Sequence, residues 1–473
     1  MPPTRLSALD ASFLAAETPS AHMHVGWVAV FDPPGDGPRP TFEDLRDHIA
    51  TRLDRAPRYR QRLAPVPLGV HDPVWVDDDR FDVARHVLRA RSSNLDEIAA
   101  AAMSTQLERS RPLWECWVAP RLDDGRMAVV GKVHHCMVDG MAAVELAALL
   151  LDATPDPPPA VADGWRPEPA PGAASRLARA VVDRTLQEAS LARLPARMLS
   201  SPGRIADAVG DARRAGLSLA RSVRPTQPSS TLNPDISPLR HLTRLSRPID
   251  DLERIKSHFG TTLNDVVLAV CAGGVRSFLA RRGEPPVRLK AMVPSTRRDA
   301  AQAGALGNGI SFLFLDLPTD DGDPVRRLQT VHRATAERKS GGDSEGGELL
   351  IRALAYAPHV VQRALARVAA SPRTFNLVVS NIPGPRDQLW MLGCPLREAY
   401  PVVPLAEGHA LAIGVTSVGD GLHFGLYADR KTLPDAHALA RPIDRAIDEL
   451  LALCGPRRGS RPRGRSGLVP LHA

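Results

Sequence analysis

The residues best suited to chemistry in this chain stand in one short run, "KVHHCMVDGMAA", which spans residues 132–143. Two adjacent histidines, His134 and His135, are followed after three residues by Asp139 and Gly140. The preceding "RMAVVGKVHH" has the composition of a buried strand, and the following "DGMAAVELAALLLDA" that of a helix. We therefore expect the histidines at the end of a strand, on a tight loop before a helix, where chemistry is commonly placed.

Three chemistries compete for this pattern. A zinc site needs three or four ligands, often with two histidines one helical turn apart, and no other dense cluster of ligands stands nearby. Covalent catalysis needs an activated nucleophile, but the neighbouring Cys136 adjoins His135 in the chain, where functional atoms rarely meet. Proton transfer fits better, because a neutral imidazole can take a proton from a hydroxyl. We therefore expect no metal here.

The spacing also predicts how the run is divided. Adjacent side chains on an extended chain point to opposite sides, so one histidine is expected in a pocket and the other in the packing behind it. Asp139 is short, and it either holds the loop through an arginine salt bridge or touches the imidazole. Gly140 lets the chain turn into the helix. Taken alone, a histidine pair at a strand end is structural more often than catalytic, so other segments have to decide.

The first part of the chain predicts a mixture of helices and strands. "HMHVGWVAVFD" (22–32) has the small and β-branched content of a strand, and "TFEDLRDHIATRL" (41–53) is an amphipathic helix with Thr41 as its N-cap. The Pro-rich run 154–172 forms neither a helix nor a central strand. From 175 to 224 the chain is helical again and rich in arginine, either as a solvated connector or as a membrane-surface helix that meets anionic headgroups.

The second part predicts a similar mixture. "PIDDLERIKSHFG" is a helix that ends at Gly260, and a long buried helix begins near Thr262 or Asn264 and ends at Gly283. Strands are predicted for "VRLKAMVPS", "ISFLFLDLP", "FNLVVSNIPGP" and "ALAIGVTSVGDGLHFGLYAD". We therefore divide the chain into a first domain (1–153), a linker and basic helical connector (154–235), a second domain (236–455) and a disordered basic tail (456–473).

Bulk properties exclude several classes of protein. The 473 residues exceed one ordinary core, which agrees with two domains. The net charge of +7 suits an anionic membrane or a phosphorylated small molecule, whereas no zinc finger, basic zipper or RNA-binding signature supports nucleic acid. Five scattered cysteines indicate a reduced, intracellular protein. The apolar run Val266–Val275 is shorter than the roughly 20 residues of a membrane span, so we expect a soluble or peripheral protein.

Several stretches together resemble a known family. "HHCMVDG" matches the HHxxxDG motif of the CoA-dependent acyltransferase superfamily. The chain further resembles the bacterial wax ester synthase/diacylglycerol acyltransferase family in "LSALDASFLAAETPSAHMHVG", "RPLWE", "TLNDVVLAV", "MVPSTRR", "LGNGISF" and "SNIPGP". These stretches occur in the family's order and span nearly the whole chain outside the linker and the tail, so their joint match is specific where each alone would be weak.

The resemblance implies an α/β fold of two chloramphenicol-acetyltransferase-like subdomains, with the active-site tunnel at their interface. It implies that His135 is the general base, that His134 stands beside it in the catalytic motif, and that Asp139 is a structural anchor. The implied partner of Asp139 is Arg297, which is otherwise a surface arginine. Trp114, in "RPLWE", is read as a core residue. The remaining motif residues carried over are Gly140, Asn264 and Asp265.

The implied reaction moves a long-chain acyl group from acyl-CoA to diacylglycerol, giving triacylglycerol, or to a fatty alcohol, giving wax ester. No cofactor is implied, since acyl-CoA is a co-substrate. Asn264 is a candidate donor to the oxyanion, or it caps its helix. Ser380 and Asn381 either donate to the oxyanion or line the pocket, and Glu17 is expected to line the pocket. The basic surface is then expected to meet CoA phosphates and the membrane or lipid droplet, in the cytoplasm and at the membrane's inner face.

Two departures from the family pattern and two other functions stay open at this stage. Gly309 stands where many relatives have a basic residue. Trp27 stands where glycine is common, and it either narrows a pocket or merely packs. The alternatives to lipid acyl transfer are an acyltransferase for polyketide or other specialised hydroxyls, including one that takes its acyl group from a carrier protein, and a non-catalytic lipid-binding member of the fold.

Overall fold

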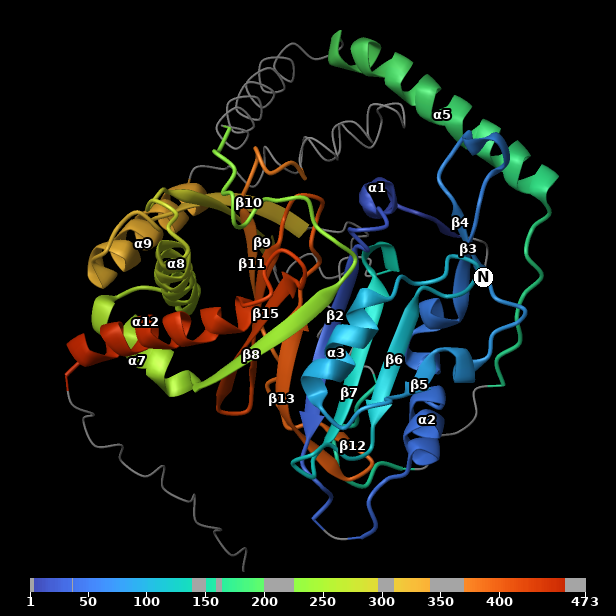
Figure 1. Cartoon of the computed structure of the whole chain (residues 1–473). Coiled ribbons are helices and arrows are strands. Elements are labelled where there is room, and N and C mark those ends of the chain that lie inside the picture. The colour runs from blue at the N-terminus through green and yellow to red at the C-terminus, as the bar shows by residue number, and fades with distance from the viewer. Residues whose placement is uncertain are drawn as a thin grey trace, which may run out of the picture.

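The computed structural model describes residues 4–35, 37–137, 150–158, 164–199, 225–296, 310–340 and 370–455 (Figure 1). Two six-stranded sheets dominate these ranges. The first sheet runs in the order β12 (Trp390–Met391), β13 (Cys394–Val402), β2 (His24–Phe31), β7 (Met127–His134), β6 (Trp114–Ala119) and β5 (Val87–Arg89). The second runs in the order β10 (Ile310–Leu317), β9 (Leu289–Thr296), β11 (Leu377–Ile382), β14 (Leu411–Val418), β15 (Gly421–Asp429) and β8 (Arg240–Pro248).

The two faces of the first sheet pack into different cores. On β2, Trp27 and Phe31 point to an outer core that includes Leu45 and Ile49 of α2 (Phe42–Ala50). Val28 and Val30 point the other way, into a core shared with α3 (Leu95–Ser104) and the second half of the chain. Successive side chains of a strand alternate between faces, so one strand supplies both cores. The inner face therefore looks toward the boundary between the two halves.

The second half of the chain completes the first sheet. β13 pairs antiparallel with β2, with Tyr400 opposite Val28, although β13 lies between β11 and β14 in the sequence. β13 also passes close to the second sheet, since a Cβ on Gly425 would lie 2.2 Å from the Pro401 carbonyl oxygen, and one on Gly414 would lie 2.9 Å from it. The boundaries 1–153 and 236–455 stay predictions, but the sheets do not follow the order of the chain.

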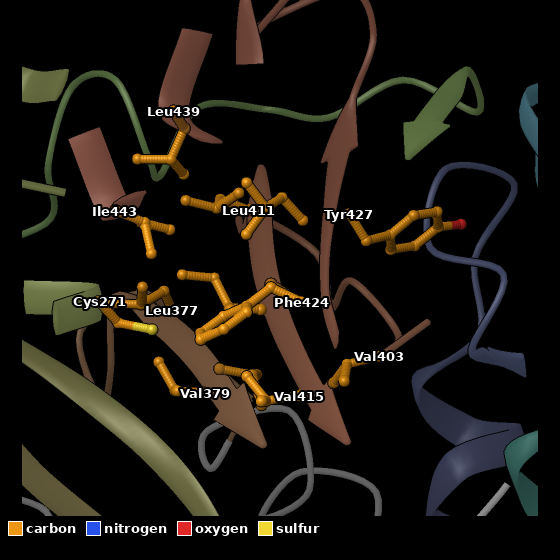
Figure 2. Packing of buried hydrophobic residues seen from close by; sticks show 14 of the residues in the cluster. Cys271, Leu377, Val379, Val403, Leu411, Val415, Phe424, Tyr427, Leu439 and Ile443 are labelled. Carbon is orange, nitrogen blue, oxygen red and sulfur yellow. The ribbon is translucent and has the colours of Figure 1, made fainter. Parts of the chain in front are cut away.

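Helices cover one face of the second sheet. They are α7 (Ile249–Phe259), α8 (Leu263–Arg281), α9 (Pro324–Ser340) and α12 (Ala440–Leu453) (Figure 1). In Figure 2, Cys271 of α8 and Ile443 of α12 meet Leu377, Leu411 and Phe424 of the strands. Within the described ranges α8 alone is long and apolar enough to cross a membrane by composition, but most of it is buried in this core.

Smaller elements complete the described chain. A three-stranded sheet has the order β1 (Thr4–Arg5), β4 (Val74–Asp77) and β3 (Gln61–Ala64), and α1 (Ala8–Ala16) follows β1. The long helix α5 (Ala173–Leu199) lies along the edge of the molecule, next to the β3–β4 hairpin (Figure 1). Short 3-10 turns are η1 (Leu53–Arg55), η2 (Pro57–Arg60), η3 (Pro67–Gly69), η4 (Val83–Arg85), η5 (His135–Met137) and η6 (Ala436–Leu439).

Most expected elements are confirmed where the structure describes them. Thr41 caps α2 with a full capping box, and Gly260 ends α7 in the left-handed conformation at φ 64°. Thr262, not Asn264, caps α8, which removes one interpretation of Asn264. The helix expected over 139–153 is not helical at its described end, 150–153, where Asp152 instead forms a β-bridge with Trp390. Residues 138–149, 200–224 and the tail 456–473 lie outside the described residues.

Candidate active site

The predicted catalytic histidines stand where β7 leaves the first sheet. His134 is the last residue of the strand, and its N–H donates to the carbonyl of Leu113 at 2.9 Å. His135 begins the 3-10 turn η5, and its N–H donates to the carbonyl of Met23 at 2.9 Å. Because the chain turns between the two residues, their side chains enter different surroundings, and the expected pocket beside one of them stays a prediction.

His134 is a packed, neutral residue. It lies opposite His24 of β2 and is buried. Its Nδ1 accepts the N–H of Cys136 at 3.2 Å, which places the ring proton on Nε2, 3.7 Å from Oε2 of Glu17. Burial, with the positive charges of His135 and Arg109, lowers the pKa of His134 to about 3. A histidine so disposed holds the strand end rather than titrating at cellular pH.

His135 keeps some exposure, and the ring of Phe13 covers one face of it. The centroids of the two rings are 3.6 Å apart and their planes differ by 18°. Burial lowers the pKa of His135 to about 4, although a hydrogen bond with its own backbone acts in the opposite direction. The imidazole is therefore neutral at cellular pH and able to accept a proton, which general base catalysis requires.

Glu17 braces His134 rather than standing free. Its side chain is 2% exposed and accepts from Nε2 of Gln106 at 2.7 Å and from Nε of Arg109 at 2.8 Å. The same carboxylate faces Nε2 of His134. The expected pocket-lining role of Glu17 stays a prediction, and these contacts give the carboxylate a structural task beside the catalytic pair.

The structure brings together two candidate donors to the oxyanion. Nδ2 of Asn381, in β11, lies 3.4 Å from Oδ1 of Asn264, in the first turn of α8. Ser380 precedes Asn381 on β11 and is buried. Asn264 is not occupied with capping, so its amide is available at the strand end. Segments more than a hundred residues apart thus converge, and oxyanion donation by these residues stays a prediction.

Asp265 has a structural role. It accepts the N–H of Thr262 at 3.0 Å, Oγ1 of Thr335 at 2.7 Å and Nδ1 of His332 at 2.8 Å. Burial alone would raise the pKa of Asp265, but the hydrogen bonds from His332, Thr335 and Thr262 outweigh it and lower the pKa. The carboxylate caps α8 and joins it to α9.

Other residues of the motifs lie outside the described residues. They are Asp139, Gly140, Arg297 and Gly309. The expected salt bridge between Asp139 and Arg297 therefore stays a prediction. In the part of the chain that is described, no group of three or more His, Cys, Asp or Glu side chains is arranged to hold a metal ion.

The two tryptophans singled out in the sequence are packed. Trp114 is 1% exposed, and its Nε1 donates to the carbonyl of Tyr59 at 2.7 Å, as expected for a core residue. Trp27 is 3% exposed on the outer face of the first sheet, against Gly131, where an added Cβ would lie 2.1 Å from the indole. The packing interpretation of Trp27 is correct, because its side chain is buried in the outer core together with Leu45 and Ile49.

One cavity lies apart from these residues. It has a volume of about 400 Å³ and is lined by charged side chains of opposite sign, among them Arg62, Asp78, Arg85 and Glu108. Such a polar, charge-balanced wall does not suit an acyl chain. None of the expected site residues lines it, so we do not assign it to the reaction.

Sequence reasoning missed the residues that hold the histidine pair. Phe13 stands within a stretch that carried the family resemblance, but nothing in its local pattern indicated a ring contact with residue 135. Arg109 and Gln106, which hold Glu17, follow α3 and gave no signal beyond polarity. These contacts depend on segments that are distant in sequence and only the folded chain reveals them.

Sequence comparison agrees with this geometry over nearly the whole chain. The model of the wax ester synthase/diacylglycerol acyltransferase catalytic domain matches residues 6–267, and that of the WS/DGAT C-terminal domain matches residues 306–451. The chain belongs to the wax ester synthase/diacylglycerol acyltransferase family. A probable diacylglycerol O-acyltransferase of Mycobacterium tuberculosis is 33% identical in sequence to this protein, over 98% of this chain and 99% of the relative.

The fold of this protein is similar to the solved structures of acyltransferases. The wax ester synthase/diacylglycerol acyltransferase from Marinobacter aquaeolei VT8 is similar, with a TM-score of 0.68 and 26% identity, covering 96% of this chain and all of that one. The trichothecene 15-O-acetyltransferase from Fusarium sporotrichioides has a TM-score of 0.60 at 12% identity, over 95% of this chain and 94% of that one. At that identity the likeness concerns the fold alone. The expected two-subdomain α/β acyltransferase fold is confirmed.

Proposed function

We propose that this family member transfers a long-chain acyl group from acyl-CoA to the hydroxyl of diacylglycerol or of a fatty alcohol, with His135 as the general base. The observation that carries the proposal is a neutral, half-buried imidazole at position 135, next to a packed His134, in the family's histidine motif. Diacylglycerol and fatty alcohols both present one hydroxyl beside an apolar chain. The products are triacylglycerol and wax ester.

The chemistry is a direct transfer. His135 takes the proton of the acceptor hydroxyl while the hydroxyl oxygen attacks the thioester carbonyl. The carbon–sulfur bond then breaks, and His135 returns the proton to the CoA sulfur. Base assistance of this kind contributes roughly 10²–10⁴ in rate, and the rest comes from positioning and from stabilising the oxyanion. No cofactor takes part, since acyl-CoA is a co-substrate.

The second subdomain supplies the proposed oxyanion donors. The amides of Asn264 and Asn381 meet at the end of β11, and Ser380 adds a hydroxyl one residue earlier. Preorganised amide and hydroxyl donors are the usual means of stabilising a developing oxyanion. Catalysis then needs the base from one subdomain and the donors from the other, which agrees with a site at their interface.

We also propose peripheral association of the enzyme with the inner face of the membrane or with lipid droplets, on the cytoplasmic side. Exposed apolar side chains lie on η3 and α5, two elements that contact each other: Leu68 is 90% exposed, Val182 55% and Leu186 64%. Nε of Arg176 on α5 donates to the carbonyl of Pro65, which fixes the two elements together. The sequence of α5 carries five arginines against Asp183 and Glu188, so anionic headgroups are the matching partner.

Flotation with vesicles of phosphatidylcholine and phosphatidylglycerol tests this association. Leu68→Asp combined with Leu186→Asp is expected to weaken binding at least about tenfold, because burying each leucine contributes roughly 1.5–3 kcal/mol. Leu453→Asp, at a residue that is 49% exposed on α12, is the matched control and is expected to bind like the wild type. Equal binding by the double variant would exclude this surface.

An acceptor screen with radiolabelled palmitoyl-CoA, read by thin-layer chromatography, tests the proposed reaction. With diolein or hexadecanol as acceptor, the wild type is expected to form labelled product, and His135→Ala to lose at least about 10² of the rate. Wild-type CoA release by His135→Ala would exclude His135 as the base. A wild type that binds acyl chains without turnover would favour a lipid-binding role instead.

A further inference from the structure

The N-terminal arm, which we define as residues 7–23, contacts the histidine loop at three points. The arm consists of α1 and the turn that leads into β2. The ring of Phe13 stacks on His135, the carbonyl of Met23 accepts the N–H of His135, and the carboxylate of Glu17 faces His134. The proposed mechanism gives no role to Phe13, Met23 or Glu17. Their contacts with one loop therefore indicate a role other than direct participation in the reaction.

The stack with Phe13 restricts the ring of His135 without blocking it. A centroid distance of 3.6 Å and an interplanar angle of 18° mean that one ring covers a face of the other. The edge of the imidazole, which carries both nitrogens, is not covered by such a stack. Torsion about the bond between Cβ and the ring is broad for histidine, so a flat neighbour fixes an orientation that the residue alone does not. A base must hold its nitrogen within hydrogen-bond reach of the hydroxyl.

The arm itself is held in place locally. Its turn is closed by Thr18, whose N–H donates to the carbonyl of Ala21 at 2.9 Å and whose Oγ1 accepts the N–H of Ala21 at 2.9 Å. The N–H of Glu17 donates to the carbonyl of Phe13 at 3.1 Å, which ends α1. Met23 adopts φ 50°, a left-handed conformation that is uncommon outside glycine and lies next to the contact with His135.

The second subdomain also holds the arm. The guanidinium of Arg240, at the start of β8, donates to the carbonyl of Ser20 and pairs with Asp429 at 3.2 Å. Arg240 and Asp429 are both buried. On the surface, Oγ1 of Thr18 donates to Glu407 at 2.7 Å. The segment that covers the face of His135 is therefore fastened to the opposite subdomain, so the position of the base depends on the docking of the two halves.

We propose that Phe13 is a positioning residue for His135: its ring, carried on an arm that Arg240 and Glu407 fasten to the second subdomain, sets the orientation of the imidazole. The proposal rests on the proposed function of His135 as general base. Phe13 touches neither the thioester nor the acceptor in this account and acts through the histidine. Its replacement therefore changes kcat more than KM.

Three variants test Phe13 in the assay with palmitoyl-CoA and hexadecanol. Phe13→Leu keeps the apolar volume but loses the flat face, and we expect kcat to fall at least about tenfold with KM and Tm close to the wild type, because misplacement of a catalytic group is costly. Phe13→Tyr keeps the flat face and is expected to stay within about threefold of the wild-type kcat. Leu14→Ala, at the neighbouring residue that packs against the outer core, is the matched control for a general disturbance of α1.

The outcomes separate this proposal from the proposed function. Wild-type kcat in Phe13→Leu, or an equal loss of kcat in Phe13→Tyr and Phe13→Leu, overturns the positioning role. An equal fall of kcat in Leu14→Ala assigns the effect to α1 as a whole and also overturns it. Wild-type turnover in His135→Ala, measured beside them, overturns the proposed function itself, whereas loss in His135→Ala with wild-type activity in Phe13→Leu overturns only the role of Phe13.

Discussion

Adjacent histidines differ in this protein because the chain leaves the sheet between them. His134 still belongs to β7, so it faces the boundary between the subdomains with its Nδ1 occupied by the N–H of Cys136. His135 belongs to the turn, where Phe13 covers one face of the ring. The pKa values of both are depressed mainly by burial, and both rings are neutral at cellular pH. Of the two side chains, only that of His135 keeps some exposure, as the proposed role of a base requires.

The residue scale also decides what Trp27 does. We expect Trp27→Ala to lower the free energy of unfolding by roughly 3–5 kcal/mol, because it empties the space above Gly131 in the outer core. Trp27→Phe fills part of that space and is expected to lose less. Urea unfolding measures the change in stability, and an acyl-CoA series from twelve to eighteen carbons measures chain-length preference. A changed preference with unchanged stability would contradict the packing role.

At the scale of elements, the sequence predicted helix ends and strand positions correctly where they depend on residues close together in the chain. A threonine N-cap marked the start of α2, and a glycine marked the end of α7. A small and β-branched composition located β2, and the composition of a buried strand located β7. The histidines His134 and His135 were predicted to stand at a strand end because the residues before them have the composition of a buried strand.

Contacts between distant elements could not be predicted in this way. β13 was not among the predicted strands, and no local pattern says that it pairs with β2 from the other half of the chain. The stack of Phe13 on His135 and the contact of Arg240 with Ser20 join residues from different elements, so they depend on tertiary packing. Propensity and periodicity describe one segment at a time and carry no information on such partners.

The junction of α8 and α9 gives a prediction at the element scale. Asp265→Ala is expected to lower the free energy of unfolding by roughly 2–4 kcal/mol, because it removes part of the capping box and the acceptor that joins α8 to Thr335 and His332 of α9. Thr262→Ala removes one part of the same capping box and is the control, with an expected loss of about 1 kcal/mol. Denaturant midpoints measure both variants. If Asp265→Ala costs no more than Thr262→Ala, the carboxylate does not join the helices.

At the scale of the whole molecule, the two halves share parts rather than merely touching. β13, from the second half of the chain, pairs with β2 in the first sheet, and its Pro401 lies against Gly414 and Gly425 of the second sheet. The buried pair of Arg240 and Asp429 reaches the N-terminal arm from the second subdomain. Because both sets of contacts cross the boundary, we expect the subdomains to unfold together rather than one after the other.

Buried histidines make the stability of the whole molecule sensitive to acid. Burial is the main cause that lowers the pKa of His24 well below its ordinary value and that of His134 to about 3. In the unfolded chain these groups take up a proton near pH 6.5. Between pH 6.5 and the folded pKa the unfolded state thus binds more protons, so stability is complete above pH 6.5 and falls as the pH drops. Histidines with lowered pKa values are His22, His24, His48, His86, His134, His135, His241, His409 and His423.

Urea unfolding at pH 7.5 and pH 5.0 checks this dependence of stability on pH. A substitution at His24 tests whether this residue contributes to it. At pH 5, His134, whose folded pKa is about 3, is expected to cost roughly 2 kcal/mol of stability, from about 1.4 kcal/mol for each unit of difference between the pH and the unfolded pKa. In His24→Gln the loss between the two pH values is expected to shrink, since the amide accepts from the N–H of Leu107 without taking up a proton. His258→Gln, at an exposed histidine of α7, should leave the loss unchanged. An identical loss in His24→Gln and the wild type would mean that His24 is not the neutral, desolvated group beside His134 that this fold requires.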